Sequence, residues 1–149
     1  MKRAYAIVLS ALSILSFANI SAAAPSGTAN YVLENADRFD GKSVTVYVRA
    51  ATAMRKNGEF YFGEQFDGVP EERMAEIKKE YVPFEAATVD TNGGTHGDII
   101  VLVKKKKAKN FEDKYQARMS YDEEGAGRNN QKIPLNGKFD KALKMIIMR

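Results

Sequence analysis

The strongest constraint on the fold is a strict alternation of side chains that begins after Lys42. Valines take every second position, and polar or aromatic residues lie between them: Val44, Val46 and Val48 against Thr45, Tyr47 and Arg49. A period of two places the valines on one face of a half-buried strand. Asn57-Gly58 then supplies the positive φ angles of a tight reversal, and Glu59 to Phe66 is expected to return as an aromatic-rich second strand. The stretch from Phe39 to Phe66 therefore predicts a twisted hairpin that the rest of the chain must close against.

The first 23 residues have the pattern of a secretory signal peptide. A short basic start precedes a mainly apolar run from Ala4 to Ile20, and small residues follow at 21–23. An uncleaved membrane anchor is the alternative, but the run is shorter than the roughly 20 strongly apolar residues that a span needs. We therefore expect cleavage after Ala23 and an exported protein, periplasmic or extracellular, with residues 24–35 as a flexible lead-in.

Charge and composition exclude several classes of function. The chain has 23 Lys and Arg against 19 Asp and Glu, and removal of Lys2 and Arg3 with the signal peptide leaves 21 against 19. So small an excess does not indicate a polyanionic partner, and we do not expect nucleic acid to bind. The chain has no cysteine and one histidine, which excludes disulfides, thiol nucleophiles and multi-histidine metal sites. We therefore expect no cofactor and no bound metal.

The rest of the mature chain alternates between ordered elements and polar loops. Proline and acids open the segment Pro70–Glu80 and lysines close it, which is the charge order that a helix dipole favours. Five consecutive apolar residues within Asp98–Lys104 indicate a strand buried on both faces. The other expected elements are a short strand over Phe84–Val89, a helix over Lys105–Gln116, strands over Ile133–Phe139 and Leu143–Met148, and loops over Thr91–Gly97 and Ser120–Gln131.

The expected order is strand, strand, helical insertion, strand, helix, strand, strand. The segment FDGKSVTVYVRAAT after Arg38 opens on an Asp-Gly turn, and Gly137 lies in the fourth expected strand. These features resemble the OB fold (oligonucleotide/oligosaccharide-binding), a five-stranded Greek-key barrel with a helix between its third and fourth strands, as found in small exported bacterial proteins. Ala50-Ala51 stand where such domains usually bend the first strand at a glycine. The resemblance implies one mainly β domain over residues 36–149, with two short helices and an insertion at 67–97. An open antiparallel α+β sheet is the alternative.

The outward side chains of the hairpin are the first candidates for a binding site. Tyr47, Arg49 and Tyr61 are expected on the solvent side if the valines and phenylalanines line the core. The OB resemblance implies a ligand on this face, where rings could stack on it. The simpler explanation is that tyrosine is a favoured strand residue.

A run of four lysines is the second candidate. Lys104, Lys105, Lys106 and Lys107 form the most concentrated charge in the chain and could contact phosphate-rich polymer or an acidic membrane surface. A solvated helix face is the alternative, because acids at Glu112 and Asp113 lie within two turns.

The glycine-rich loop holds the only histidine, His96, close to Asp98. No nucleophile elbow, phosphate-binding loop or dinucleotide fingerprint occurs in the sequence, so we assign no catalytic residue. The sequence therefore predicts a non-catalytic exported binding module whose partner is a protein or small ligand of the cell envelope. A small secreted hydrolase or metal-assisted enzyme that uses the loop Thr91–Asp98, and a structural envelope protein, are the alternatives.

Overall fold

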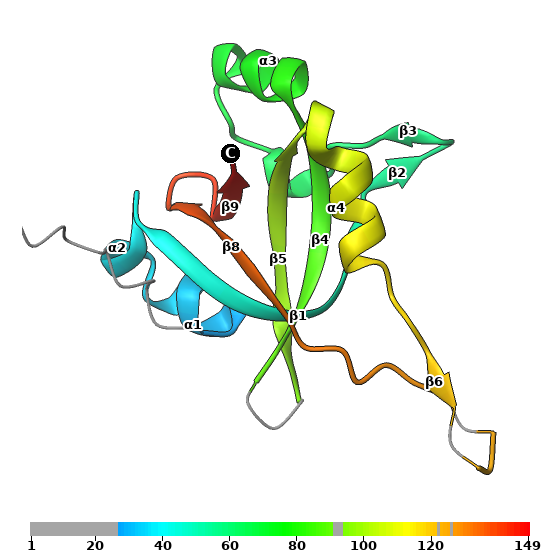
Figure 1. The fold of residues 1–149 in the computed structure, drawn as a ribbon. Helices are drawn as coiled ribbons and strands as arrows, with labels where there is room; N and C mark the ends of the chain where they lie inside the picture. Colours follow the sequence, from blue (N-terminus) through cyan, green and yellow to red (C-terminus); the bar gives the residue numbers. More distant parts are fainter. Residues whose placement is uncertain (1–26, 91–93, 122, 126) are drawn as a thin grey trace, which may run out of the picture.

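The alternating valines lie in the first strand of a closed five-stranded barrel (Figure 1). The computed structural model describes residues 27–90, 94–121, 123–125 and 127–149. The barrel strands are β1 (Ser43–Ala53), β4 (Tyr81–Val89), β5 (Thr95–Lys104), β8 (Ile133–Asp140) and β9 (Met145–Met148). Their order around the barrel is β1-β4-β5-β9-β8, with β5 and β9 parallel and the other neighbours antiparallel. The prediction of a mainly β, five-stranded barrel is confirmed, and the open-sheet alternative is excluded.

A bulge in β1 lets the barrel close. Val44, Val46 and Val48 are buried, as the alternation predicts. β1 pairs with β8 up to Val48 and with β4 from Val48 onward, and the register shifts between Val48 and Ala50. Arg49 is therefore the extra residue of a β-bulge, which bends a strand as a glycine would. Strand order, closure and the position of α4 (Ala108–Tyr115) between the third and fourth barrel strands are compatible with an OB-like fold.

The predicted second strand of the hairpin is wrong. Asn57 and Gly58 have φ angles of 55° and 84°, so the expected tight turn forms, but it joins only β2 (Arg55–Lys56) and β3 (Glu59–Phe60). The chain then leaves the strand and forms a 3-10 turn, η1 (Glu64–Phe66). The aromatic residues after the turn contact two different apolar clusters, so their spacing does not produce a barrel strand.

The second barrel strand is β4, which lies inside the predicted insertion at 67–97. That insertion is a wrong assignment, because the segment that connects the first two barrel strands spans residues 54–80 and includes α3 (Glu71–Glu80). Pro83 lies within β4, where its carbonyl accepts a hydrogen bond from the Met54 N–H at 3.0 Å.

Part of the predicted flexible lead-in is ordered. Residues 24–35 contain α1 (Ala29–Glu34), whose first turn is capped by the Thr28 hydroxyl, which accepts a hydrogen bond from the Tyr31 N–H at 3.3 Å. Ala29 and Val32 are buried in the main core. The burial of these two side chains accounts for the order of α1, and α2 (Ala36–Phe39) follows it before β1.

The connecting segment 54–80 covers part of the outer surface of the barrel. β5 is buried on both faces, as predicted: Val101 belongs to the main core, whereas Ile100 and Leu102 belong to a second cluster. That second cluster also contains Phe66 and Ile77 from the connecting segment. Each buried aliphatic or aromatic side chain contributes about 1.5–3 kcal/mol, so this cluster fixes the segment against the barrel.

The remaining elements extend or cover the barrel. A 3-10 turn, η2 (Lys105–Lys107), leads into α4, which buries Ala108, Phe111 and Tyr115 and contacts β1 and β5. A short arm of β6 (Ser120–Tyr121) and β7 (Gly127–Arg128) projects away from the barrel (Figure 1). None of the helices in the described part of the chain is long and apolar enough to cross a membrane.

Candidate functional site

A pocket of about 540 Å³ lies where the connecting segment meets the start of β4 and the end of β5. We call it the aromatic–lysine pocket. Its lining residues are Phe60, Tyr61, Phe62, Lys78, Tyr81, Val82 and Lys105. A pocket of this volume is within the range of 300–1,000 Å³ that is common for small-molecule sites.

The tight turn between β2 and β3 brings three successive aromatic residues to the pocket. The Tyr61 N–H donates to the Met54 carbonyl at 2.9 Å, which holds the chain beside the end of β1. Phe62 packs edge-to-face on the buried Phe66, with ring centroids 5.0 Å apart. Phe60 packs against the main core, while the Tyr61 side chain stays 42% exposed. Two of the rings are therefore anchored, and the third faces solvent.

The end of α3 also contributes to the pocket. Ile77 is buried in the second cluster, and the Tyr81 N–H caps the helix by donating to the Ile77 carbonyl. This arrangement leaves Lys78 exposed on the last turn of the helix, a position that the helix dipole favours for a cation. Tyr81 then begins β4 and pairs in register with Lys104 of β5, so Lys105 follows directly at the pocket.

Each of the four rings in the pocket has a cation near its face. The distances from the cationic group to the ring centroid run from 4.2 to 6.0 Å for four pairs: Arg55 with Phe60, Lys56 with Tyr61, Lys78 with Phe62 and Lys104 with Tyr81. Such contacts contribute about 0.5–1 kcal/mol at exposed sites. Their concentration here makes the pocket both aromatic and electropositive.

One ion pair lies at the edge of the pocket. Lys104 Nζ donates to Glu80 Oε2 at 2.6 Å. This hydrogen bond, with the attraction between the two charges, lowers the pKa of Glu80 from its ordinary value of 4.5. The same hydrogen bond raises the pKa of Lys104 above 10.5. Both groups therefore stay charged at neutral pH, and the charge of Lys104 is neutralised locally.

The structure separates the three outward hairpin residues. Tyr61 lines the aromatic–lysine pocket, whereas Tyr47 and Arg49 do not. Tyr47 is half-buried beneath Lys132, whose Nζ lies 5.0 Å from the ring centroid. Arg49 is half-buried in the bulge of β1, and its carbonyl accepts a hydrogen bond from Asn129 Nδ2 at 3.4 Å. Both residues therefore lie against the segment that precedes β8.

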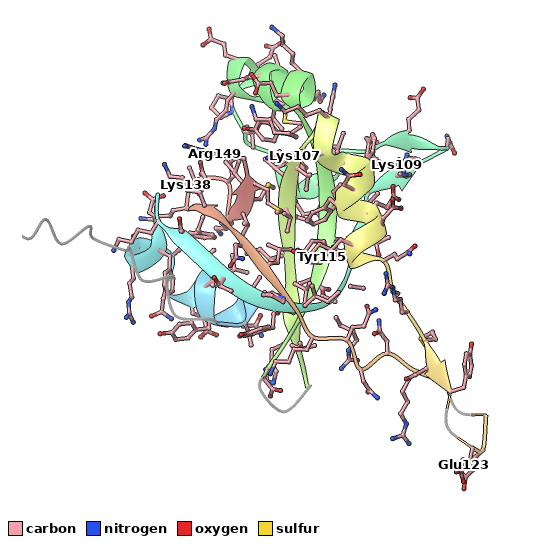
Figure 2. All side chains as sticks on the ribbon, in the orientation of Figure 1. Lys107, Lys109, Tyr115, Glu123, Lys138 and Arg149 are labelled. Atoms are coloured by element: carbon pink, nitrogen blue, oxygen red, sulfur yellow. The ribbon has the colours of Figure 1, made fainter. Side chains whose placement is uncertain are left out.

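The lysine run is divided among different environments. Lys104 pairs with Glu80, and Lys105 lines the pocket. Lys106 is exposed, and Lys107 Nζ donates to the Arg149 carbonyl at 2.6 Å, at the end of the barrel where the chain finishes (Figure 2). The run therefore forms no single row of lysines that all face solvent without a partner.

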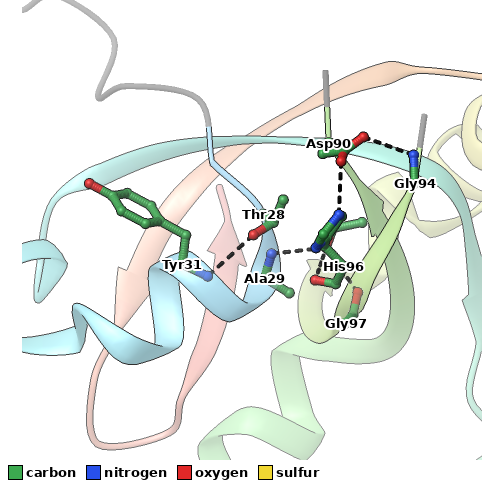
Figure 3. A network of polar contacts seen from close by, with 8 residues as sticks. Thr28, Ala29, Tyr31, Asp90, Gly94, His96 and Gly97 are labelled. Atoms are coloured by element: carbon green, nitrogen blue, oxygen red, sulfur yellow. Dashed lines mark hydrogen bonds and ion pairs between the residues drawn. The ribbon is translucent and has the colours of Figure 1, made fainter. Parts of the chain in front are cut away.

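The loop between β4 and β5 is described from Gly94 onward, and residues 91–93 of the predicted loop lie outside the described residues. His96 contacts Asp90, with Nε2 2.8 Å from Oδ2, and not the neighbouring Asp98 of the sequence hypothesis (Figure 3). Asp90 also accepts a hydrogen bond from the Gly94 N–H at 2.8 Å. In the described part of the chain, no group of three His, Cys, Asp or Glu residues is placed to hold a metal ion.

The backbone around His96 is held by a buried threonine. Thr88 Oγ1 accepts a hydrogen bond from the Ala29 N–H at 2.9 Å. Its hydroxyl also lies 2.9 and 2.8 Å from the carbonyls of His96 and Gly97, toward which it donates (Figure 3). These hydrogen bonds tie α1 to the β4–β5 hairpin through the backbone carbonyls of His96 and Gly97.

Sequence reasoning missed most of the pocket. Tyr61 and Lys105 were both candidates, but as members of separate sites. Lys78 was assigned only to a helix, and Tyr81 was not a candidate. Three successive aromatic residues, separated from the Asn-Gly turn only by Glu59, were the available signal. Comparison with known proteins adds no candidate: no family model, curated protein sequence or solved structure matches the chain.

Proposed function

We propose that the chain is an exported, non-catalytic binding module with an OB-like barrel, and that it holds its ligand in the aromatic–lysine pocket. The observation that carries this proposal is the gathering of four rings and two lysines around one hollow of about 540 Å³. Aromatic side chains supply large contact areas at low entropic cost, and lysines supply orientation by charge. The signal-peptide pattern supports export, which would place the ligand or partner protein in the cell envelope or medium.

The chemistry of the lining supports binding over catalysis. None of the seven lining residues is a carboxylate, a histidine, a serine, a threonine or a cysteine. General acid–base catalysis is most often performed by histidine and carboxylates, and covalent catalysis often by serine or cysteine. The lining offers apolar contact and positive charge, which are the requirements of recognition.

A fragment screen by ligand-observed NMR tests the proposal. Fragments that bind the wild-type protein should lose their signal with Tyr61→Ala, because this ring is the exposed wall of the pocket. Tyr61→Phe keeps the ring and should retain binding. The matched control is Tyr47→Ala, which removes a tyrosine that does not line the pocket. Fragments whose binding is unchanged by Tyr61→Ala but lost with Tyr47→Ala would contradict the proposal.

A further inference from the structure

We infer that the ligand of the aromatic–lysine pocket is a planar ring that carries an acidic group, either a carboxylate or a phosphate. This inference rests on the proposed function and names the chemical class of its ligand. It follows from three properties of the pocket, namely its charge, its walls and its extent.

The charge of the pocket is positive and not neutralised from within. Its lining holds Lys78 and Lys105 and no acid. Two nearby acids are already engaged, because Glu80 pairs with Lys104 at 2.6 Å and Glu112 pairs with Arg55 at 3.3 Å. Across the described residues, Lys78 and Lys105 make no ion pair. A ligand anion would supply the missing negative charge between them.

The aromatic lining of the pocket favours a ligand with a planar aromatic ring over a saturated ligand. Five of the seven lining residues are apolar or aromatic, and four of them are rings: Phe60, Tyr61, Phe62 and Tyr81. Aromatic rings prefer offset or edge-to-face contacts with other rings, which stabilise a complex beyond the area that they bury. Tyr61 is 42% exposed, so its ring is accessible to a ligand.

The extent of positive charge favours a small ligand over a long polyanion. Within the lysine run, Lys104 is paired with Glu80 and Lys107 is bound to the Arg149 carbonyl. The two lysines that remain at the pocket come from different elements, α3 and η2. Two lysines match the charge of a single acidic group, whereas an extended polyanion would need a continuous row of cations.

Four probes separate the contributions of ring and charge. They are naphthalene-2-carboxylate, 2-naphthyl phosphate, naphthalene-2-methanol as the neutral ring, and cyclohexanecarboxylate as the anion without an aromatic ring. Isothermal titration of the purified protein should give a Kd for at least one of the two acidic naphthalenes that is about tenfold or more below that of either control, since tenfold corresponds to about 1.4 kcal/mol. The tighter of the two acidic probes identifies carboxylate or phosphate as the preferred group.

Variants of exposed lysines show whether the charge acts from the pocket. Lys105→Gln should weaken the acidic probe about 3- to 10-fold and leave the affinity for naphthalene-2-methanol unchanged. Lys109→Gln is the matched control, because Lys109 is an exposed lysine of α4, the helix that follows η2, and does not line the pocket. It should leave every affinity unchanged.

Three results would overturn the inference. Equal affinity for the neutral and acidic naphthalenes would show that the ligand needs no acidic group. Equal affinity for cyclohexanecarboxylate and naphthalene-2-carboxylate would show that it needs no aromatic ring. Binding of none of the four probes overturns both requirements. In each case the fragment screen decides separately whether the pocket binds a ligand of another class, so failure of this inference is distinct from failure of the proposed function.

Discussion

Substitution of Gly137 by alanine tests the packing at the corner where β1, β8 and β9 converge. Gly137 pairs with Val44 of β1, and a Cβ atom built on it would lie 2.4 Å from Ile146 Cγ2 and 3.0 Å from the Ile147 carbonyl oxygen. Carbon atoms in contact are usually 3.5–4.0 Å apart, so one atom must move by more than 1 Å. The Ile146 side chain is fully buried and the other neighbour is backbone, so neither can move freely.

The sign of the change in the free energy of unfolding shows whether a Cβ atom at position 137 clashes with its neighbours. Without a clash, Gly→Ala stabilises a protein by about 0.4–1 kcal/mol, because it restricts the unfolded chain. Overpacking of a core costs about 1–3 kcal/mol. We therefore expect Gly137→Ala to lower the free energy of unfolding by about 1–2 kcal/mol in urea denaturation, with little change in the m value. Lys138→Ala, an exposed neighbour on the same strand, should stay within about 0.5 kcal/mol of wild type. A Gly137→Ala protein more stable than wild type would refute the reasoning.

Three further predictions follow from other contacts. Thr88→Val keeps the volume of the side chain but leaves the Ala29 N–H without its acceptor. It should lower the free energy of unfolding in urea by about 1–3 kcal/mol and speed hydrogen exchange at Ala29. Unchanged exchange would contradict this. Phe111→Ala empties the interface of α4 with the barrel and should cost about 3–5 kcal/mol in the same assay, against less than 1 kcal/mol if α4 were loosely attached. The pKa of Glu80 is lowered by Lys104, so the pair stabilises the fold fully above pH 4.5 and loses this contribution as the pH falls further. The stability difference between wild type and Glu80→Gln should therefore shrink below pH 4.5, and a constant difference would argue against the ion pair.

Local sequence patterns predicted the elements whose burial follows from the spacing of their own apolar residues. The valine alternation of β1 and the five apolar residues of β5 each report burial of one or two faces, and both interpretations are confirmed. The helix predicted over Lys105–Gln116 also forms from Ala108 onward, because its apolar side chains recur at helical spacing.

The local patterns did not show which distant segments pair as neighbouring strands. The aromatic spacing of Glu59–Phe66 is as typical of a strand as the sequence of β4 is. Which of two such segments pairs with β1 depends on the whole barrel, including the second apolar cluster beneath residues 54–80. Local propensity therefore selected the wrong second strand.

The pocket could not be predicted for the same reason. Tyr81 and Lys105 come together only because β4 and β5 pair in one register, in which Tyr81 lies opposite Lys104. A shift of one residue would turn every side chain of β4 to its other face. Register is a property of the closed barrel. The sequence therefore showed the aromatic residues and the lysines but not that they lie close together in the fold.

A chemical-shift map is the most direct test of the central claim, that the aromatic–lysine pocket is the binding site. The backbone amides of the ¹⁵N-labelled protein would be followed during titration with the ligand that binds most tightly among the four probes and the fragments of the screen. We predict that the largest shifts fall at residues 60–62, 81–82 and 105, and that they disappear in Tyr61→Ala. Largest shifts around Tyr47 and Arg49, or no shift in the pocket at saturating ligand, would contradict the account.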